Sequence, residues 1–346
     1  MRLQEFSKGG RFACTTVLAA FACAIPLTAQ VSLTGAGATF PAPIYQKWFN
    51  DYQSVGNAQI NYQPNGSGGG IKAVTEGTVD FGASDAPLTD AQLQTYRAKN
   101  GHGVFLFPTV LGAAVASYNL PGVTQELNFT PEALAGIFLG TIKKWNDGAI
   151  AKANPGVKLP DLDIVVIHRS DGSGTTYCWT DYLSKVSPEW KSKVGKNTSV
   201  EWPTGLGASK SDGVAGLLKQ QEGAIGYVEL IFAVRNHLAF GKVKNKSGEF
   251  VKADLKSVTA AAAGGEMPAD FRVSITDPAA KGAYPISTFT WLMVPDRISD
   301  AAKRKALTGF LSWAITKGQD EVEQLDYSRL PASVVAKEEK QIALIK

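Results

Sequence analysis

Glycine-rich segments that contain Ser or Thr occur at residues 35–41, 65–70 and 169–175, and each directly precedes a stretch with helical periodicity. Glycine allows the backbone to approach a ligand closely, and Ser or Thr at such positions is typical of helix N-caps. A helix N-terminus presents unpaired N–H donors and a partial positive charge, which suit an anion. Each segment alone is consistent with an ordinary capped helix. If the three converge in space, they would bind a small tetrahedral anion largely through neutral donors.

Two charged residues of the third segment add to this hypothesis. Arg169 precedes its glycines, and a guanidinium can direct a planar pair of donors at two anion oxygens. Asp171 follows two residues later and is expected to pair with Arg169 and to fix its orientation. The alternative is an Arg–Asp pair on a surface turn that binds no ligand.

Asp85 lies within residues 80–89, Asp-Phe-Gly-Ala-Ser-Asp-Ala-Pro-Leu-Thr. A carboxylate repels an anion, so the residue is either an ordinary loop or capping residue or a contact to an anion that carries a proton. Phosphate near neutral pH carries a proton that a carboxylate can accept, whereas sulfate has none to donate. Against sulfate, two acceptors would face each other unpaired, which is costly in a buried site. Asp85 therefore favours phosphate over sulfate as the ligand.

Short apolar runs alternate with amphipathic stretches along the chain, which predicts an α/β fold. A helix over residues 43–52 carries an aromatic stripe at i, i+3, i+4 and i+7 spacing, which indicates a core-facing surface. Residues 242–281 have the weakest pattern, and 260–265 are expected to be a mobile surface segment. The predicted strands are 60–63, 103–108, 164–167 and 288–294. The other predicted helices are 131–139, 175–186, 213–221 and 301–316. No Pro/Gly/Ser linker separates sequential domains, which favours lobes between which the chain crosses.

The first 29 of the 346 residues have the composition of a secretory signal peptide. Arg2, Lys8 and Arg11 precede an apolar run, and Leu-Thr-Ala ends it, so cleavage is expected after Ala29. The run is short for a membrane span. A buried N-terminal helix, a membrane anchor and a lipoprotein modified at Cys23 are the alternatives.

Loss of residues 1–29 removes three basic residues and Glu5, so the formal charge falls from +4 to +2. That charge is too small to indicate nucleic-acid or membrane-surface binding. Cys178 would be the one cysteine of the mature chain, which excludes an internal disulfide. No later segment has the roughly 18 apolar residues that a membrane span needs.

The sequence resembles the phosphate-binding protein family of the bacterial high-affinity phosphate ABC transporter. The resemblance runs from about residue 31 to 338 and is weakest over 242–281. The segments that carry it are 33–41, 79–88, 143–147, 171–175, 223–229 and 325–328.

The resemblance implies a periplasmic, monomeric solute-binding protein that delivers inorganic phosphate to membrane permease subunits, without a cofactor or a metal. The implied fold is α/β, a type II-like periplasmic-binding-protein fold with two lobes. Each lobe is a mixed sheet flanked by helices, and crossing strands form the hinge. Lobe I would comprise residues 30–108 and 286–346, and lobe II residues 109–285. The implied phosphate-binding residues are Thr39, Phe40, Ser67, Asp85, Arg169, Ser173, Gly174 and Thr175, with Asp171 as the partner of Arg169.

Three other functions compete with this interpretation. A hydrolase or phosphatase is disfavoured because neither Ser67 nor Ser173 lies in a Gly-x-Ser-x-Gly elbow, and because His168 should point to the opposite face of its strand from Arg169. No cluster of His, Asp and Glu has metal-ligand spacing. A receptor for sulfate or molybdate is disfavoured by Asp85. A phosphate-scavenging or adhesive surface protein stays open.

Overall fold

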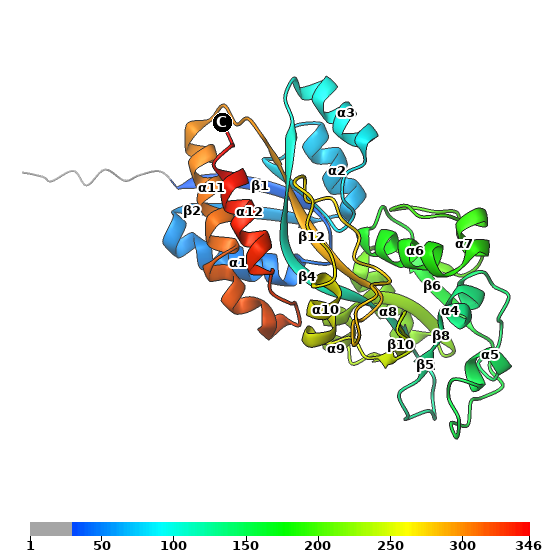
Figure 1. Ribbon diagram of the computed structural model, residues 1–346. Helices are drawn as coiled ribbons and strands as arrows, with labels where there is room; N and C mark the ends of the chain where they lie inside the picture. The colour runs from blue at the N-terminus through cyan, green and yellow to red at the C-terminus, as the bar shows by residue number, and fades with distance from the viewer. Residues whose placement is uncertain (1–29) are drawn as a thin grey trace, which may run out of the picture. The chain divides into compact units, whose positions relative to one another are not determined.

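A computed structural model describes residues 30–346 (Figure 1). The predicted signal peptide and its cleavage after Ala29 lie outside the described residues. The strands of the described part are β1 (Val31–Gly37), β2 (Ala58–Pro64), β3 (Phe81–Ser84), β4 (Val104–Tyr118), β5 (Asn128–Phe129), β6 (Val165–Arg169), β7 (Leu206–Ala208), β8 (Ala224–Glu229), β9 (Ala239–Phe240), β10 (Lys242–Lys244), β11 (Phe250–Val251) and β12 (Ser287–Pro295).

The helices alternate with these strands and flank them. They are α1 (Ala42–Gly56), α2 (Ser67–Thr75), α3 (Asp90–Asn100), α4 (Pro131–Phe138), α5 (Gly148–Ala151), α6 (Gly174–Val186), α7 (Pro188–Lys193), α8 (Lys210–Gln220), α9 (Leu230–Arg235), α10 (Leu255–Ala262), α11 (Ala301–Ala314) and α12 (Ala332–Ile342), with the 3₁₀ helix η1 (Lys317–Leu325). Every strand and helix predicted above overlaps one of these elements. The predicted mixed α/β class is confirmed.

The main sheet has the strand order β2-β1-β3-β12-β4-β8-β6-β7, and β9 also pairs with β4. Strands β1, β2 and β3 are mutually parallel, as are β7, β6 and β8, whereas β12 and β4 run antiparallel to their neighbours. A small sheet has the order β11-β10-β5. The parallel groups matter for the site, because the carboxyl ends of parallel strands meet at one edge.

Strand β4 connects the two parallel groups. Its first part, up to Ala113, pairs with β12, and residues 114–118 pair with β8 (Figure 1). The prediction that this strand ends at Pro108 is wrong, because the register shifts there: Trp291 pairs with Pro108 and Thr290 with Val110. The bulge leaves Thr109 unmatched and accommodates a proline that cannot donate to the ladder.

The aromatic stripe of α1 is confirmed as part of the core. Tyr45, Trp48, Phe49 and Tyr52 are buried. Phe49 packs against rings of β2, β3 and α11, with centroid distances of 6.0 Å to Tyr62, 6.1 Å to Phe81 and 5.2 Å to Phe310. Aromatic pairs of this kind contribute about 0.5–1.5 kcal/mol each beyond the area they bury. They hold α1 on the sheet, and with it the turn that precedes the helix.

The predicted surface segment 260–265 is exposed at residues 263–265 but begins as helix. Residues up to Ala262 form the last turn of α10, and Ala261 is buried. Alanine has the highest helix propensity of any residue, so the alanine run continues the helix, and the glycines 264 and 265 follow its end.

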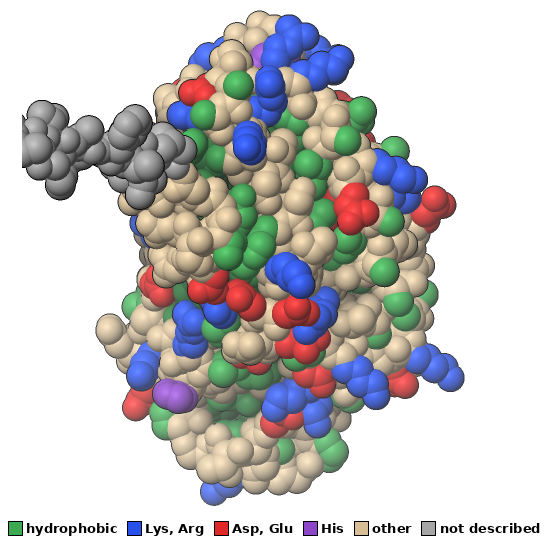
Figure 2. All heavy atoms as spheres, turned by 90° about the vertical axis from the view of Figure 1, so that its left-hand side faces the viewer, with side chains coloured by type: hydrophobic (Ala, Val, Ile, Leu, Met, Phe, Trp, Pro, Cys, Tyr) green, Lys and Arg blue, Asp and Glu red, His purple; other side chains and the backbone are tan. Residues whose placement is uncertain are grey.

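Charged side chains of both signs intermingle on the face shown in Figure 2. Lys47 of α1 lies 2.7 Å from Asp51, and Arg329 lies 2.8 Å from Asp320. Exposed pairs of this kind stabilise a protein by at most about 1 kcal/mol each. Among residues 30–346, none of the helices combines the length and the apolar run that a bilayer crossing requires.

Glu338 of α12 is a buried carboxyl group that neither donates nor accepts a hydrogen bond within the described chain. Burial raises its pKa well above the ordinary value, so its proton is held more tightly in the folded than in the unfolded state. The residue therefore destabilises the fold progressively as the pH rises above about 4.5, the unfolded pKa.

We expect Glu338→Gln to be more stable than the parent, with a difference that grows with pH by at most about 1.4 kcal/mol per pH unit. Urea unfolding at several pH values measures this difference. A difference that does not change with pH would contradict the assignment of a neutral buried carboxyl.

Candidate anion-binding site

The predicted site residues lie at the carboxyl ends of strands from both parallel groups. Thr39 follows β1, Ser67 follows β2 and begins α2, and Asp85 directly follows β3. Because these strands are parallel, their ends meet at one edge. Arg169 is the last residue of β6, and the turn after it leads into α6. All of these side chains are buried.

Hydrogen bonds join the two sets of residues directly. The Ser67 hydroxyl accepts from the backbone N–H of Gly174 at 3.0 Å and from that of Asp85 at 3.2 Å. The N–H of Gly68 donates to the carbonyl of Gly172 at 2.9 Å. The second and third glycine-rich segments are therefore in backbone contact.

The prediction that a Ser or Thr of each glycine-rich segment caps the following helix is correct for one segment of the three. Ser173 does cap α6, since its Oγ accepts from the N–H of Thr176 at 3.1 Å. The N-caps of α1 and α2 are instead Pro41 and Gly66, without a side-chain cap. Thr39 precedes the cap, and Ser67 is already in the helix. Their hydroxyls lie against other site residues rather than against the helix that follows.

Several backbone donors at these helix starts have no protein acceptor. Within residues 30–346, this holds for the N–H groups of Thr39, Phe40, Ser67 and Thr175. Unpaired N–H groups of the first helical turn are the donors that bind anions. The carbonyl of Phe40 accepts from the Tyr327 hydroxyl at 2.6 Å, which fixes this turn.

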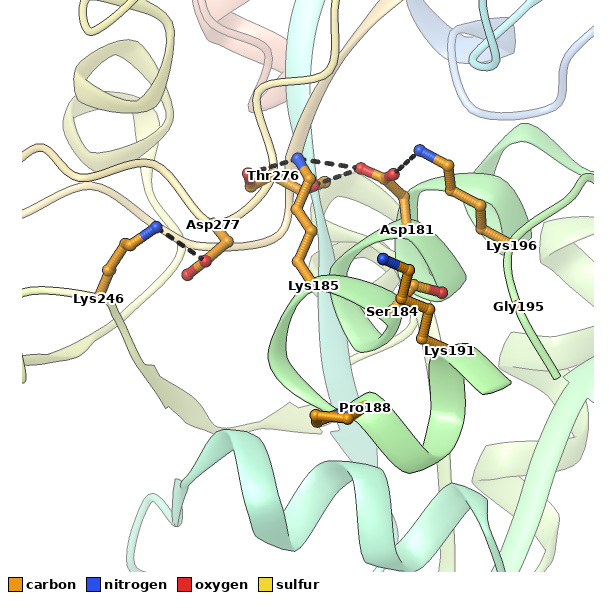
Figure 3. Close-up of a pocket in the computed structure, with 10 residues that line it drawn as sticks. All are labelled: Asp181, Ser184, Lys185, Pro188, Lys191, Gly195, Lys196, Lys246, Thr276 and Asp277. Carbon is orange, nitrogen blue, oxygen red and sulfur yellow. Dashed lines mark hydrogen bonds and ion pairs between the residues drawn. The ribbon is translucent and has the colours of Figure 1, made fainter. Parts of the chain in front are cut away.

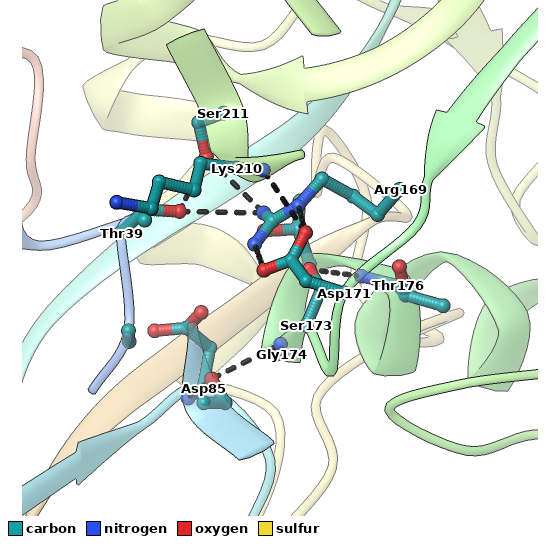
Figure 4. A network of polar contacts seen from close by, with 12 residues as sticks. Thr39, Asp85, Arg169, Asp171, Ser173, Gly174, Thr176, Lys210 and Ser211 are labelled. Atoms are coloured by element: carbon teal, nitrogen blue, oxygen red, sulfur yellow. Dashed lines mark hydrogen bonds and ion pairs between the residues drawn. The ribbon is translucent and has the colours of Figure 1, made fainter. Parts of the chain in front are cut away.

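Arg169 and Asp171 form the expected two-point pair (Figure 4). Nε lies 2.7 Å from Oδ1, and the second amino nitrogen lies 2.5 Å from Oδ2. Burial raises the pKa of Asp171, but the hydrogen bond and charge of Arg169 outweigh it, and the net shift is downward. The remaining amino group, Nη1, lies 3.3 Å from the hydroxyls of both Thr39 and Ser211. Asp171 thus orients a guanidinium whose remaining amino group points to Thr39 and Ser211.

Asp85 is fully buried, and its Oδ1 accepts a hydrogen bond from Thr290 at 2.7 Å. Burial raises its pKa to about 8; the Thr290 hydrogen bond opposes this, and the charge of Glu229 adds to it. A neutral carboxyl can donate a proton to an anion, whereas an ionised one can only accept. Asp85 therefore makes the site sensitive to whether the ligand carries a proton.

Three residues that the sequence did not single out complete the network: Ser211, Glu229 and Thr290. Glu229 belongs to segment 223–229, which carries the family resemblance, but nothing in the pattern indicated its contact with the site. Ser211 lies in the first turn of α8 (Figure 4). It could have been found as a further helix start that follows a short apolar segment. Thr290 lies within a buried strand and gave no signal.

Helix α6 is anchored at its far end by a buried carboxylate. Asp181 accepts from Lys196 at 2.5 Å and from Thr276 at 2.5 Å (Figure 3). It also accepts from Ser274 at 2.5 Å. Burial raises the pKa of Asp181, but the hydrogen bonds outweigh it, so the pKa lies below its usual value. A hollow of about 710 Å³ lies beside this cluster. The cluster ties the helix that carries Ser173, Gly174 and Thr175 to the segment leading into β12.

His168 lies outside the network. Its ring stacks on Trp202 at a centroid distance of 4.8 Å, and its Nδ1 lies 3.1 Å from the carbonyl oxygen of Arg169. Burial lowers its pKa. This position agrees with the expectation that the His168 side chain points to the opposite face of the strand from Arg169.

Gly174 lies where the two sets of residues approach most closely. A Cβ at this position would lie 2.5 Å from the Cβ of Asp85. We expect Gly174→Ala to separate them and to weaken anion binding about 5- to 150-fold, the equivalent of an overpacking cost of about 1–3 kcal/mol. Titration calorimetry measures this loss.

Gly216→Ala in α8 is the matched control, because a Cβ there meets no atom within 4 Å. It should stabilise the helix by about 1 kcal/mol and leave anion binding unchanged. Equal anion affinity in both variants would show that close approach at Gly174 is not needed.

Comparison with known proteins gives the family. A model described as the PBP superfamily domain matches residues 24–317. The phosphate-binding protein PstS of Xylella fastidiosa is 43% identical over 311 residues, which cover 89% of this chain and 84% of the relative. The chain belongs to the PstS family of phosphate-binding proteins. The resemblance inferred from its motifs is thereby confirmed.

Solved structures agree on the fold of this family. A periplasmic phosphate-binding protein called PfluDING, bound with phosphate, aligns with a TM-score of 0.71 at 22% identity, over 90% of this chain and 93% of its own. A protein of Clostridium perfringens, described as a candidate phosphate ABC transporter substrate-binding protein with bound phosphate, aligns with a TM-score of 0.63 at 18% identity. The alignment covers 87% of this chain and 100% of the Clostridium perfringens chain. The periplasmic-binding-protein fold is thus confirmed.

Proposed function

We propose that this PstS-family protein binds one inorganic phosphate ion at the junction of β1, β2, β3 and β6 and delivers it to the permease of an ABC transporter. The observation that carries the proposal is the convergence of helix N-termini, a paired arginine and a buried carboxyl at one place. The free N–H groups supply neutral donors and Arg169 supplies charge. Binding rather than catalysis is the activity that these groups support.

The geometry supports a specific set of ligand contacts. Thr39, Phe40, Ser67 and Thr175 would donate their backbone N–H groups, and Arg169 would donate from Nη1, the nitrogen that lies against the Thr39 and Ser211 hydroxyls. Ser173 and Gly174 form the start of α6 that faces Ser67. Asp85 would accept the proton of phosphate and select against an anion without one.

We assign residues 30–108 and 286–346 to lobe I and residues 109–285 to lobe II. The continuous strand β4 and the return at β12 would form the hinge. A phosphate between the lobes would favour the closed form, because it contacts both, and a permease could recognise that form. The relative PfluDING is described as periplasmic, which supports a periplasmic location for this protein. Cleavage after Ala29 and a monomeric state are parts of the same proposal.

Titration calorimetry of the ligand-stripped protein with phosphate, arsenate and sulfate tests the proposal. Phosphate and arsenate should bind at a single site, and sulfate should not compete at about pH 9, where Asp85 is ionised. Absence of phosphate binding would overturn the proposal. Sulfate binding as tight as phosphate binding under that condition would overturn the role of Asp85.

Two further measurements separate the remaining functions. Sustained turnover of a phosphomonoester by the pure protein would indicate a phosphatase. Phosphate uptake by a strain lacking the protein separates transport from scavenging or adhesion, since only loss of the transport component should abolish high-affinity uptake.

A further inference from the structure

Glu229, the last residue of β8, is a second buried carboxyl group beside the site. Its Oε1 accepts hydrogen bonds from the hydroxyls of Thr175 and Ser211, the latter at 3.2 Å. Its Oε2 has no hydrogen-bond partner within the described chain. Among residues 30–346 it forms no salt bridge, and its side-chain hydrogen-bond partners are both hydroxyl groups.

A chain of hydroxyls leads from Glu229 to the proposed ligand contact. Ser211 Oγ lies 2.7 Å from Thr39 Oγ1, and the Arg169 Nη1 donates to both oxygens at 3.3 Å (Figure 4). Each hydroxyl has a single proton to donate. The donor at one end of the chain therefore sets the direction of every hydrogen bond along it.

An ionised Glu229 can only accept. Ser211 then donates to Glu229, and Thr39 donates to Ser211. The Thr39 oxygen would present only lone pairs to an anion, which is repulsive. When Glu229 carries a proton, it donates to Ser211, and Ser211 donates to Thr39. The hydroxyl proton of Thr39 is then free to point at an anion oxygen.

We propose that Glu229 is a positioning residue that sets the direction of the Thr39 hydroxyl through Ser211, so that phosphate binding places a proton on Glu229. The proton comes from the buffer, and no covalent bond to phosphate forms or breaks. This inference rests on the proposed function and adds a proton-linked contact to it.

The electrostatic surroundings favour the protonated form once an anion is bound. The ionisable groups that interact with Glu229 are Arg169 at the end of β6, Asp85 after β3, Cys178 of α6 and Tyr327 after η1. Burial raises the pKa of Glu229, and the charge of Arg169 opposes this. Arg169 is itself neutralised by Asp171, so an added phosphate leaves excess negative charge around Glu229.

Calorimetric titration with inorganic phosphate in buffers of different ionisation enthalpy counts the protons taken up. If phosphate binding takes up one proton, the apparent affinity falls by up to about tenfold for each pH unit of increase in the alkaline range. Glu229→Gln should take up about one proton fewer than the parent on binding phosphate. Its phosphate affinity should therefore fall less steeply with rising pH, by up to about tenfold less per pH unit. Proton uptake equal to the parent's would overturn the proposal.

Variants of Ser211 test whether the linkage between Glu229 and Thr39 passes through the Ser211 hydroxyl. Ser211→Ala removes the hydroxyl between Glu229 and Thr39 but keeps the carboxyl, so proton uptake should fall as in Glu229→Gln. Ser211→Thr keeps a hydroxyl and should restore it. Full uptake in Ser211→Ala would show that the linkage is purely electrostatic, which overturns the relay through Ser211 even if Glu229→Gln fails to fold.

Glu338→Gln is the matched control, since it replaces a buried carboxyl outside the site by an amide and should leave the proton count unchanged. A change in that variant would overturn the assignment to Glu229. Failure of the parent protein to bind phosphate would instead refute the proposed function. Phosphate binding with identical uptake in the parent and in Glu229→Gln leaves the function intact and removes only this inference.

Discussion

Arg169→Ala is expected to weaken phosphate binding about 10²- to 10⁴-fold. The residue would supply charge-assisted hydrogen bonds, and bonds to charged groups contribute about 1.5–3 kcal/mol each. The substitution also leaves Asp171, whose side chain is 20% exposed, without its partner. An unpaired carboxylate at the site then repels the ligand, so the loss exceeds that of the missing bonds alone.

Arg169→Lys and the double variant Arg169→Ala/Asp171→Asn separate these contributions. Lysine keeps the charge but not the planar pair of donors, so an intermediate affinity is expected. Removing both charges should recover part of the loss. Calorimetry measures each affinity.

Arg329→Ala is the control for a general effect of losing an arginine. Arg329 also binds two carboxylates, Asp320 and Glu323, but on an exposed surface. Its loss should leave phosphate affinity unchanged. Similar affinities for Arg169→Ala and the parent would place the anion site elsewhere.

Asp85→Asn is expected to reduce discrimination between phosphate and sulfate about 5- to 150-fold, while phosphate affinity changes less. The carboxylate repels an anion that has no proton, and that mispaired contact costs about 1–3 kcal/mol. An amide can donate to either anion, so the variant should accept sulfate. Competition titrations with both anions measure the ratio.

The pH dependence of this discrimination has a definite sign. With a pKa of about 8, Asp85 is neutral at lower pH and can donate to sulfate, whereas at higher pH it is ionised and excludes it. Discrimination in the parent should therefore rise as the pH increases through about 8, and it should be flat in Asp85→Asn. Glu338→Gln, which replaces a buried carboxyl elsewhere by an amide, should behave as the parent. Discrimination that falls with rising pH would contradict the role of Asp85.

The elements that position the site were predictable because their patterns are local. The aromatic stripe of α1 has helical spacing, and glycines preceded the helices that begin at Ala42, Ser67 and Gly174. The Arg169–Asp171 pair follows from two residues in one turn. Strand β4 was predicted too short, because the register shift that accommodates Pro108 depends on its partner β12.

By itself, the sequence determined that the chain is an α/β protein with anion-binding turns, and its motifs indicated the phosphate-binding family. Those features depend on residue type and short-range spacing. The tertiary structure decided which hydroxyls serve the site and which cap helices, since Thr39 and Ser211 meet from positions 172 residues apart.

Tertiary structure also determined the protonation of the carboxyl groups. Asp85 and Glu229 are ordinary acids in the sequence. Burial in the fold raises the pKa of both, and the charge of Glu229 adds to the rise at Asp85. Desolvation depends on every element packed around a group, which no local pattern records. The sequence could therefore name the anion and one carboxyl that senses its proton, and the fold alone brought a second carboxyl within reach of the same site.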